Sequence, residues 1–247
     1  MDTPGSGDRY TVWRKAFAEF LGSALLVATV VGSGIAAQTL SPNDVGLQLL
    51  ENSIATGAVL VALILALGPV SAAFNPVVTL AERALGAVTN SEAVIFITAQ
   101  VTGACLGSVL ANLMFDLDAV TISTKERTGG GLWLAEVVAT FGLLVVIFGV
   151  VRSGRDAFVP FAVGGYIAAA YWFTSSTSFA NPAVTIARTL TDTFAGIDPT
   201  SVLAFVAMQL VGGALAVGAV LALYPNARDV AANVADLNPT EKDHTHG

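Results

Sequence analysis

The sequence predicts an all-α membrane protein with six transmembrane helices, two re-entrant half-helices and an inverted internal repeat. Three observations carry this prediction. Charged residues make up only 12% of the 247 residues, the apolar residues fall in long blocks, and short motifs of the first half recur in the second. A soluble domain usually carries about 25% charged residues, so the composition indicates the lipid bilayer as a partner.

Six apolar blocks are candidates for membrane spans, because a helix needs roughly 20 residues to cross the hydrocarbon core. Five blocks reach this length, and the fifth in chain order needs the residues from 155 onward to do so. The blocks comprise residues 16–37, 47–67, 93–115, 132–151, 159–173 and 202–224.

The blocks predict one membrane domain, residues 13–224, with a first repeat at about 13–115 and a second at about 132–224. Polar tails precede and follow this domain, at residues 1–12 and 225–247.

Lysine and arginine residues predict the orientation. With the N-terminus inside, only Lys125, Arg127 and Arg188 fall outside, which is typical of a cell-membrane protein with both termini in the cytoplasm. No basic stripe with interleaved aromatic residues is present, so nucleic acid is not an expected partner. His244 and His246 lie in the polar tail and do not indicate a metal site.

The two halves of the chain repeat each other. Three spans per half is an odd number, so the second copy must insert upside down, which places a shared pathway near the membrane midplane. The matched segments are Asn75-Pro76-Val77-Val78-Thr79 with Asn181-Pro182-Ala183-Val184-Thr185, Glu19 with Glu136, Gln100 with Gln209, and the small-residue pairs at Gly103 and Gly212.

Each Asn-Pro pair predicts the start of a short helix, because asparagine caps helices and proline suits the first helical position. Residues 77–85 and 183–190 are long enough for only two to three turns. In an inverted repeat these half-helices enter from opposite faces and their N-termini meet at the midplane. Each N-terminus carries roughly half a positive elementary charge, which opposes cations.

Glu19 and Glu136 are predicted to be buried structural acids. Carboxylates within a span usually face inward, and loops bent back into the membrane have free N–H groups that need acceptors. The alternative is that both acids lie at the interface and are solvated.

These residues resemble the aquaporins of the major intrinsic protein family, over residues 13–224. The duplicated Asn-Pro segments, the six spans and the paired glutamates carry the resemblance. It implies a homotetramer with one pore per subunit that passes water or small uncharged solutes passively. It implies no enzymatic activity, cofactor or metal.

Two departures from the family pattern stand out. Val77 replaces the usual alanine, and the loop at residues 71–74 is one residue short and lacks a histidine. At the outer filter, the family generally has an arginine where this chain has Val184. The resemblance gives the filter as Thr56, Ala169, Ser178 and Val184, which predicts a wide, uncharged and mildly polar constriction.

Arg188 lies four residues after Val184, hence one helical turn further out. We expect it in an outer vestibule, paired with Asp192, Asp116 or Asp118. The alternative is a plain surface ion pair.

An arginine-free filter resembles a bacterial branch of aquaporins that passes metalloid hydroxides and organic arsenicals, and residues 191–197 resemble that branch too. Glycerol and urea fit such a filter as well. The alternatives are a strictly water-selective channel, a secondary transporter, and a structural tetramer whose pore Val77 and Val184 close.

Overall fold

The computed structural model describes residues 10–224, which form helices and loops without strands. The predictions for His244, His246 and most of both tails fall outside these residues. The helices are α1 (Val12–Leu40), α2 (Val45–Leu67), α3 (Pro76–Leu85), α4 (Asn90–Met114), α5 (Gly130–Arg152), η1 (Asp156–Phe158), α6 (Val159–Phe173), α7 (Pro182–Ala187), η2 (Arg188–Leu190) and α8 (Pro199–Leu223).

The predicted fold class is confirmed. Within the described range, five helices are long and apolar enough to cross a membrane, namely α1, α2, α4, α5 and α8. The remaining long helix, α6, has 15 residues and follows directly after η1, which begins at Asp156. The half-helices α3 and α7 begin at the two Asn-Pro pairs.

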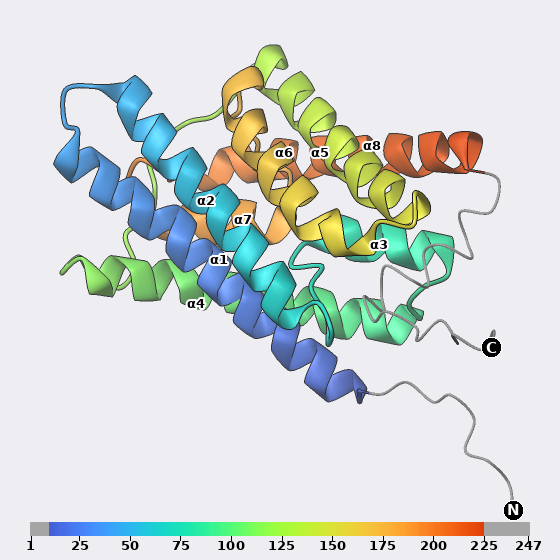
Figure 1. The fold of residues 1–247 in the computed structure, drawn as a ribbon. Helices are drawn as coiled ribbons and strands as arrows, with labels where there is room; N and C mark the ends of the chain where they lie inside the picture. Colours follow the sequence, from blue (N-terminus) through green and yellow to red (C-terminus); the bar gives the residue numbers. More distant parts are fainter. Residues whose placement is uncertain (1–9, 225–247) are drawn as a thin grey trace, which may run out of the picture.

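The helices are arranged as two inverted halves. In each half the first helix packs on the fourth, α1 on α4 and α5 on α8, while α2 and α6 join the halves. Figure 1 shows α3 in the part of the bundle where α1 begins and α7 in the part where α1 ends. The two half-helices therefore approach each other from opposite ends.

Glycines let the helix backbones approach closely. A Cβ atom at Gly103 would lie 2.2 Å from the Phe20 carbonyl oxygen, and one at Gly107 would lie 2.3 Å from that of Ala24. A Cβ atom at Gly212 would lie 2.5 Å from the Val137 carbonyl oxygen. The small residues therefore serve the close packing that their spacing predicts.

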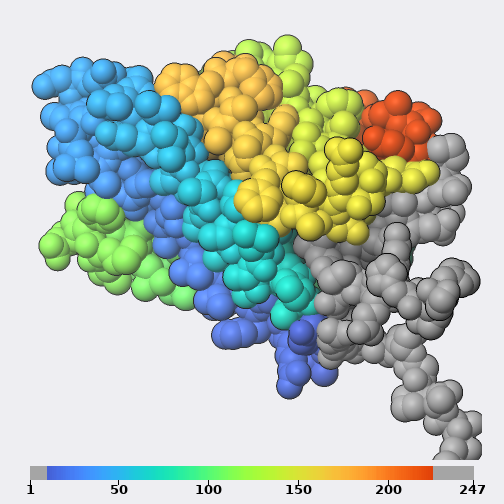
Figure 2. Space-filling model, in the orientation of Figure 1, coloured from blue at the N-terminus to red at the C-terminus, as the bar shows by residue number. Residues whose placement is uncertain are grey.

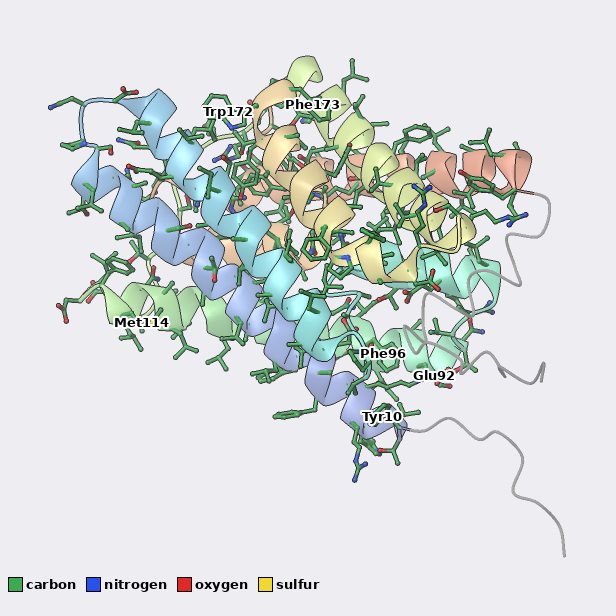
Figure 3. All side chains as sticks on the ribbon, viewed as in Figure 1. Tyr10, Glu92, Phe96, Met114, Trp172 and Phe173 are labelled. Carbon is green, nitrogen blue, oxygen red and sulfur yellow. The ribbon has the colours of Figure 1, made fainter. Side chains whose placement is uncertain are left out.

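The second helices of the two halves meet in the same way. A Cβ atom at Gly164 would lie 2.5 Å from the Gly57 carbonyl oxygen. Figure 2 shows α2 and α6 side by side on one face of the molecule. Trp172 and Phe173, at the end of α6, remain exposed, and Figure 3 places them on the outside of the bundle. Exposed aromatic residues at a helix end suit a membrane–water interface.

Candidate functional site

The two asparagines cap the half-helices at the centre of the molecule. The Asn75 Oδ1 atom accepts a hydrogen bond from the Val77 N–H at 3.0 Å, and the Asn181 Oδ1 atom accepts one from the Ala183 N–H at 2.9 Å. Such a bond satisfies a backbone donor that a helix N-terminus otherwise leaves unpaired.

The same asparagines connect the two halves. The Asn75 Nδ2 atom donates to the Ala180 carbonyl oxygen at 2.8 Å, and the Asn181 Nδ2 atom donates to the Phe74 carbonyl oxygen at 2.7 Å. A side-chain amide has two N–H donors, so each asparagine keeps a second donor for a passing solute.

Phe74 and Ala180 precede the asparagines with left-handed backbones, at φ values of 48° and 47°. A non-glycine residue pays roughly 1–2 kcal/mol for this conformation. The turn directs each N–H towards a buried glutamate and each carbonyl towards the asparagine of the other half. The strained backbone therefore places these N–H and carbonyl groups for the bonds that join the two loops.

Glu19 holds the first loop. Its carboxylate accepts hydrogen bonds from the Ser71 hydroxyl, from the Ala73 and Phe74 N–H groups, and from Gln100 Nε2, at 2.5–2.9 Å. Its side chain is fully buried, so the alternative of a solvated interface acid is wrong.

Glu136 makes the matching contacts in the second half and is also fully buried. It accepts from the Phe179 N–H at 3.0 Å, the Ala180 N–H at 2.9 Å and Gln209 Nε2 at 2.6 Å. Each re-entrant loop thus has its N–H groups bound to one buried carboxylate.

A cavity of about 90 Å³ runs past both asparagines, which is room for several water molecules. Its wall combines hydrogen-bonding groups with aliphatic side chains of α1, α2, α5 and α6. The polar groups include Thr56, Ser71, Asn75, Tyr171, Ser178 and Asn181.

Three of the four predicted filter residues, Thr56, Ser178 and Val184, line this cavity. The Thr56 hydroxyl lies 3.1 Å from that of Tyr171. The Ser178 hydroxyl is buried and has no hydrogen-bond partner among the described residues, so it is available to a solute.

The assignment of Ala169 to the filter is wrong. This residue is exposed on α6 and does not line the cavity. The inward face of α6 instead presents Val163, Ile167 and Tyr171, which are spaced by four residues as one face of a helix requires. The wall contributed by α6 therefore consists of larger side chains than alanine, and one of them, Tyr171, carries a hydroxyl.

The expected pairing of Arg188 is also wrong. Asp116 and Asp118 are exposed, and Asp192 accepts a hydrogen bond from the Thr124 N–H at 2.9 Å. No ion pair joins Arg188 to any of the three within residues 10–224.

Arg188 is instead buried, at 3% exposure, and lines the cavity. Its Nε atom donates to the Ala195 carbonyl oxygen, and its guanidinium carbon lies 3.5 Å from the centre of the Phe179 ring. The cavity wall therefore carries a charge at Arg188, one helical turn outward from Val184.

Two further basic residues, Arg127 and Lys125, lie near Arg188. The guanidinium of Arg127 lies 4.8 Å from the Phe179 ring, on which Arg188 also packs, and its Nε atom donates to the Gly196 carbonyl oxygen at 3.0 Å. Burial lowers the pKa of Arg127 to about 10, so it remains protonated at neutral pH. The Lys125 Nζ atom donates to the Phe194 carbonyl oxygen at 2.9 Å.

Val77 does not line the cavity. A Cβ atom at Gly213 would lie 2.4 Å from Val77 Cγ1, so the valine packs against a glycine of α8. The prediction that Val77 contributes to closing the pore is therefore wrong. Val78 is the residue of α3 that faces the cavity next to Asn75.

Sequence reasoning missed two charged residues at the other end of the cavity, Lys15 on α1 and Glu82 on α3. Both are buried, at 8% and 5% exposure. The available signal was spacing, because Glu82 lies four residues after Val78 and hence on the same face of the half-helix.

A cavity past two capped half-helices, within a bundle of apolar helices, defines a membrane channel. The chain belongs to the major intrinsic protein family, whose model matches residues 7–178. It is a channel for water and small solutes and not an enzyme.

Known relatives cover almost the whole chain. The aquaglyceroporin AqpS of Rhizobium meliloti (strain 1021) is 49% identical over 222 residues, which are 90% of this chain and 94% of the relative. Aquaporin AqpM of Methanothermobacter thermautotrophicus is 31% identical over 240 residues, which are 85% of this chain and 94% of the relative.

A solved structure shares the fold. The aquaglyceroporin from Plasmodium falciparum matches with a TM-score of 0.69 at 18% identity, covering 88% of this chain and 99% of that chain.

Proposed function

We propose that the channel passes water together with small uncharged hydroxylated solutes such as glycerol, and also urea, arsenous acid and organic arsenicals. The observation that carries this proposal is the mixed cavity wall, which contains both hydroxyl and amide groups and aliphatic side chains. A polyol needs both, because its oxygens must exchange water for protein partners while its carbons favour apolar contact. The printed name of the 49% identical relative, an aquaglyceroporin, supports the same choice.

Val184 is the centre of this proposal. It lines the cavity, as Thr56 and Ser178 do, and its side chain carries no charge. Arsenous acid is neutral and carries hydroxyl groups, as glycerol does, so one filter serves both. Arg188 then acts one turn outward and not at Val184.

A strictly water-selective channel is the second candidate. The observation that favours it is Tyr171, whose bulk and hydroxyl occupy the wall where a small alanine was predicted. A secondary transporter fits less well, because Glu19 and Glu136 already accept several hydrogen bonds from the protein and are not placed as coupling-ion ligands.

The same proposal includes a homotetramer in the cell membrane with both termini in the cytoplasm. The exposed apolar faces of the long helices support contact with lipid or with other copies. The distribution of lysine and arginine supports the orientation.

Val184→Arg tests the proposed solute range. We expect glycerol and arsenous acid permeability of reconstituted vesicles to fall by at least ~10-fold and water permeability by no more than ~3-fold, because a second guanidinium beside Arg188 narrows the passage and excludes the larger solutes first. Stopped-flow light scattering measures all three. Val184→Leu is the control for size without charge.

Three results would contradict the proposal. Wild-type vesicles that pass water but not glycerol would favour the second candidate. An equal loss of water and glycerol permeability in Val184→Arg would show that Val184 is not part of the filter. Uphill accumulation of a solute driven by an ion gradient would show a transporter.

A further inference from the structure

The side chain of Phe179 is held in the cavity wall by contacts on both its backbone and its ring. It lines the cavity and is 4% exposed. Its N–H donates to Glu136 Oε1 at 3.0 Å. The fully buried ring of Phe205 meets it at an interplanar angle of 71°, with the ring centres 5.2 Å apart. Such an edge-to-face pair is a favourable arrangement of two aromatic rings, so the position of the Phe179 ring is well defined.

Arg188 is the cation that lies closest to this ring. Its guanidinium carbon is 3.5 Å from the ring centre, which places the planar group over the face of the ring. The face of an aromatic ring carries partial negative charge and attracts a cation, more strongly where water is excluded. Arg188 is buried, so this contact is largely desolvated.

Few other contacts hold the Arg188 guanidinium. Its Nε atom donates to the Ala195 carbonyl oxygen, and its terminal amino groups donate no hydrogen bond to protein within residues 10–224. The positive charge of Arg127 is close enough to repel it. The stack on Phe179 is therefore the contact that opposes this repulsion and fixes the plane of the guanidinium.

The adjacent cavity is the space into which a released guanidinium would move. Arg188 lines this cavity, and protein atoms do not fill it. A guanidinium in the passage would obstruct glycerol before it obstructs water, because glycerol is the larger solute.

We propose that Phe179 is a positioning residue that holds the guanidinium of Arg188 against the wall and so keeps the passage open to solutes larger than water. Loss of the ring face then has the same consequence as Val184→Arg, although no charge is added. This inference rests on the proposed channel for water and small uncharged hydroxylated solutes.

The test measures the ratio of glycerol to water permeability in proteoliposomes by stopped-flow light scattering. Phe179→Leu removes the ring face but keeps an apolar side chain, and the ratio should fall by at least ~5-fold. Arg188→Lys keeps the charge but has no planar group to stack on the ring, so the ratio should also fall by at least ~5-fold. Phe179→Tyr keeps the ring face and should hold the ratio within ~2-fold of wild type.

A double-mutant cycle distinguishes positioning of Arg188 from simple packing. In Arg188→Gln no guanidinium needs to be held, so adding Phe179→Leu should not lower the ratio further. An equal fall caused by Phe179→Leu in both backgrounds overturns the inference, because it shows a packing role. A rise of the ratio in Phe179→Leu alone also overturns it, since the smaller side chain then merely widens the passage.

Arg188→Lys keeps the inference testable if Phe179→Leu does not fold, because an unchanged ratio in Arg188→Lys also overturns it. Wild-type vesicles that pass water but exclude glycerol refute the proposed solute range, and the inference with it. Failure of the variants alone, with glycerol passing through the wild type, refutes only the role of Phe179.

Discussion

Glu136→Ala is expected to abolish solute flux and to prevent normal folding. The substitution leaves three N–H groups without their acceptor in a fully buried site, those of Phe179 and Ala180 and one of the two on the Gln209 side chain. Each unsatisfied buried donor costs about 1–3 kcal/mol, so three of them remove much of the stability of a typical domain. The loop that carries Asn181 then loses its anchor.

The measurement is the yield and thermal unfolding of the purified protein in detergent, followed by glycerol flux in vesicles. Glu126→Ala is the control, because Glu126 is exposed on the loop before α5. Glu136→Gln should fall between the two, since it retains one acceptor oxygen. A Glu136→Ala protein with wild-type Tm and flux would show that the carboxylate does not hold the loop.

Gly212→Val is expected to separate α5 from α8 and to eliminate the folded channel. A Cβ atom there would lie 2.5 Å from the Val137 carbonyl oxygen and 3.1 Å from Thr140 Cβ. Backbone cannot move aside as a flexible side chain can, and overpacking a close contact costs typically 1–3 kcal/mol even when the structure relaxes. The two extra methyl groups of valine increase this cost.

Gly218→Val on the same helix is the matched control. Gly218 is exposed, and a Cβ atom there meets nothing within 4 Å. Both variants carry the same loss of glycine and gain of a β-branched residue, so they differ only in what the side chain meets. Gly212→Val should lose both the elution peak of the folded protein in size-exclusion chromatography and its glycerol flux. Gly218→Val should retain both. Equal behaviour of the two would contradict the close-packing role.

Local signals in the sequence predicted the half-helices well. The capping side chain and the proline act within a few residues, so Asn75 and Asn181 mark helix starts without knowledge of the fold. The need of buried N–H groups for acceptors likewise predicted partners for Glu19 and Glu136.

The errors arose where a contact depends on distant parts of the chain. The direction of Val77 follows from Gly213 on another helix, and the burial of Arg188 follows from the Phe179 ring and the Ala195 carbonyl. Ala169 was assigned by its match to a family position. The inward face of α6 is instead marked by the four-residue spacing of Val163, Ile167 and Tyr171. Neither contact partners nor helix rotation can be read from composition.

The crossed bonds of the asparagines also bear on how the protein is made. Asn75 binds a carbonyl from the second half, and Asn181 binds one from the first. Neither half can complete its own loop. When only the first four helices have been inserted into the membrane, the Asn75 amide still lacks the carbonyl of the second half that it binds in the finished protein. The asparagine bonds that join the two halves can therefore form only when the second half docks on the first.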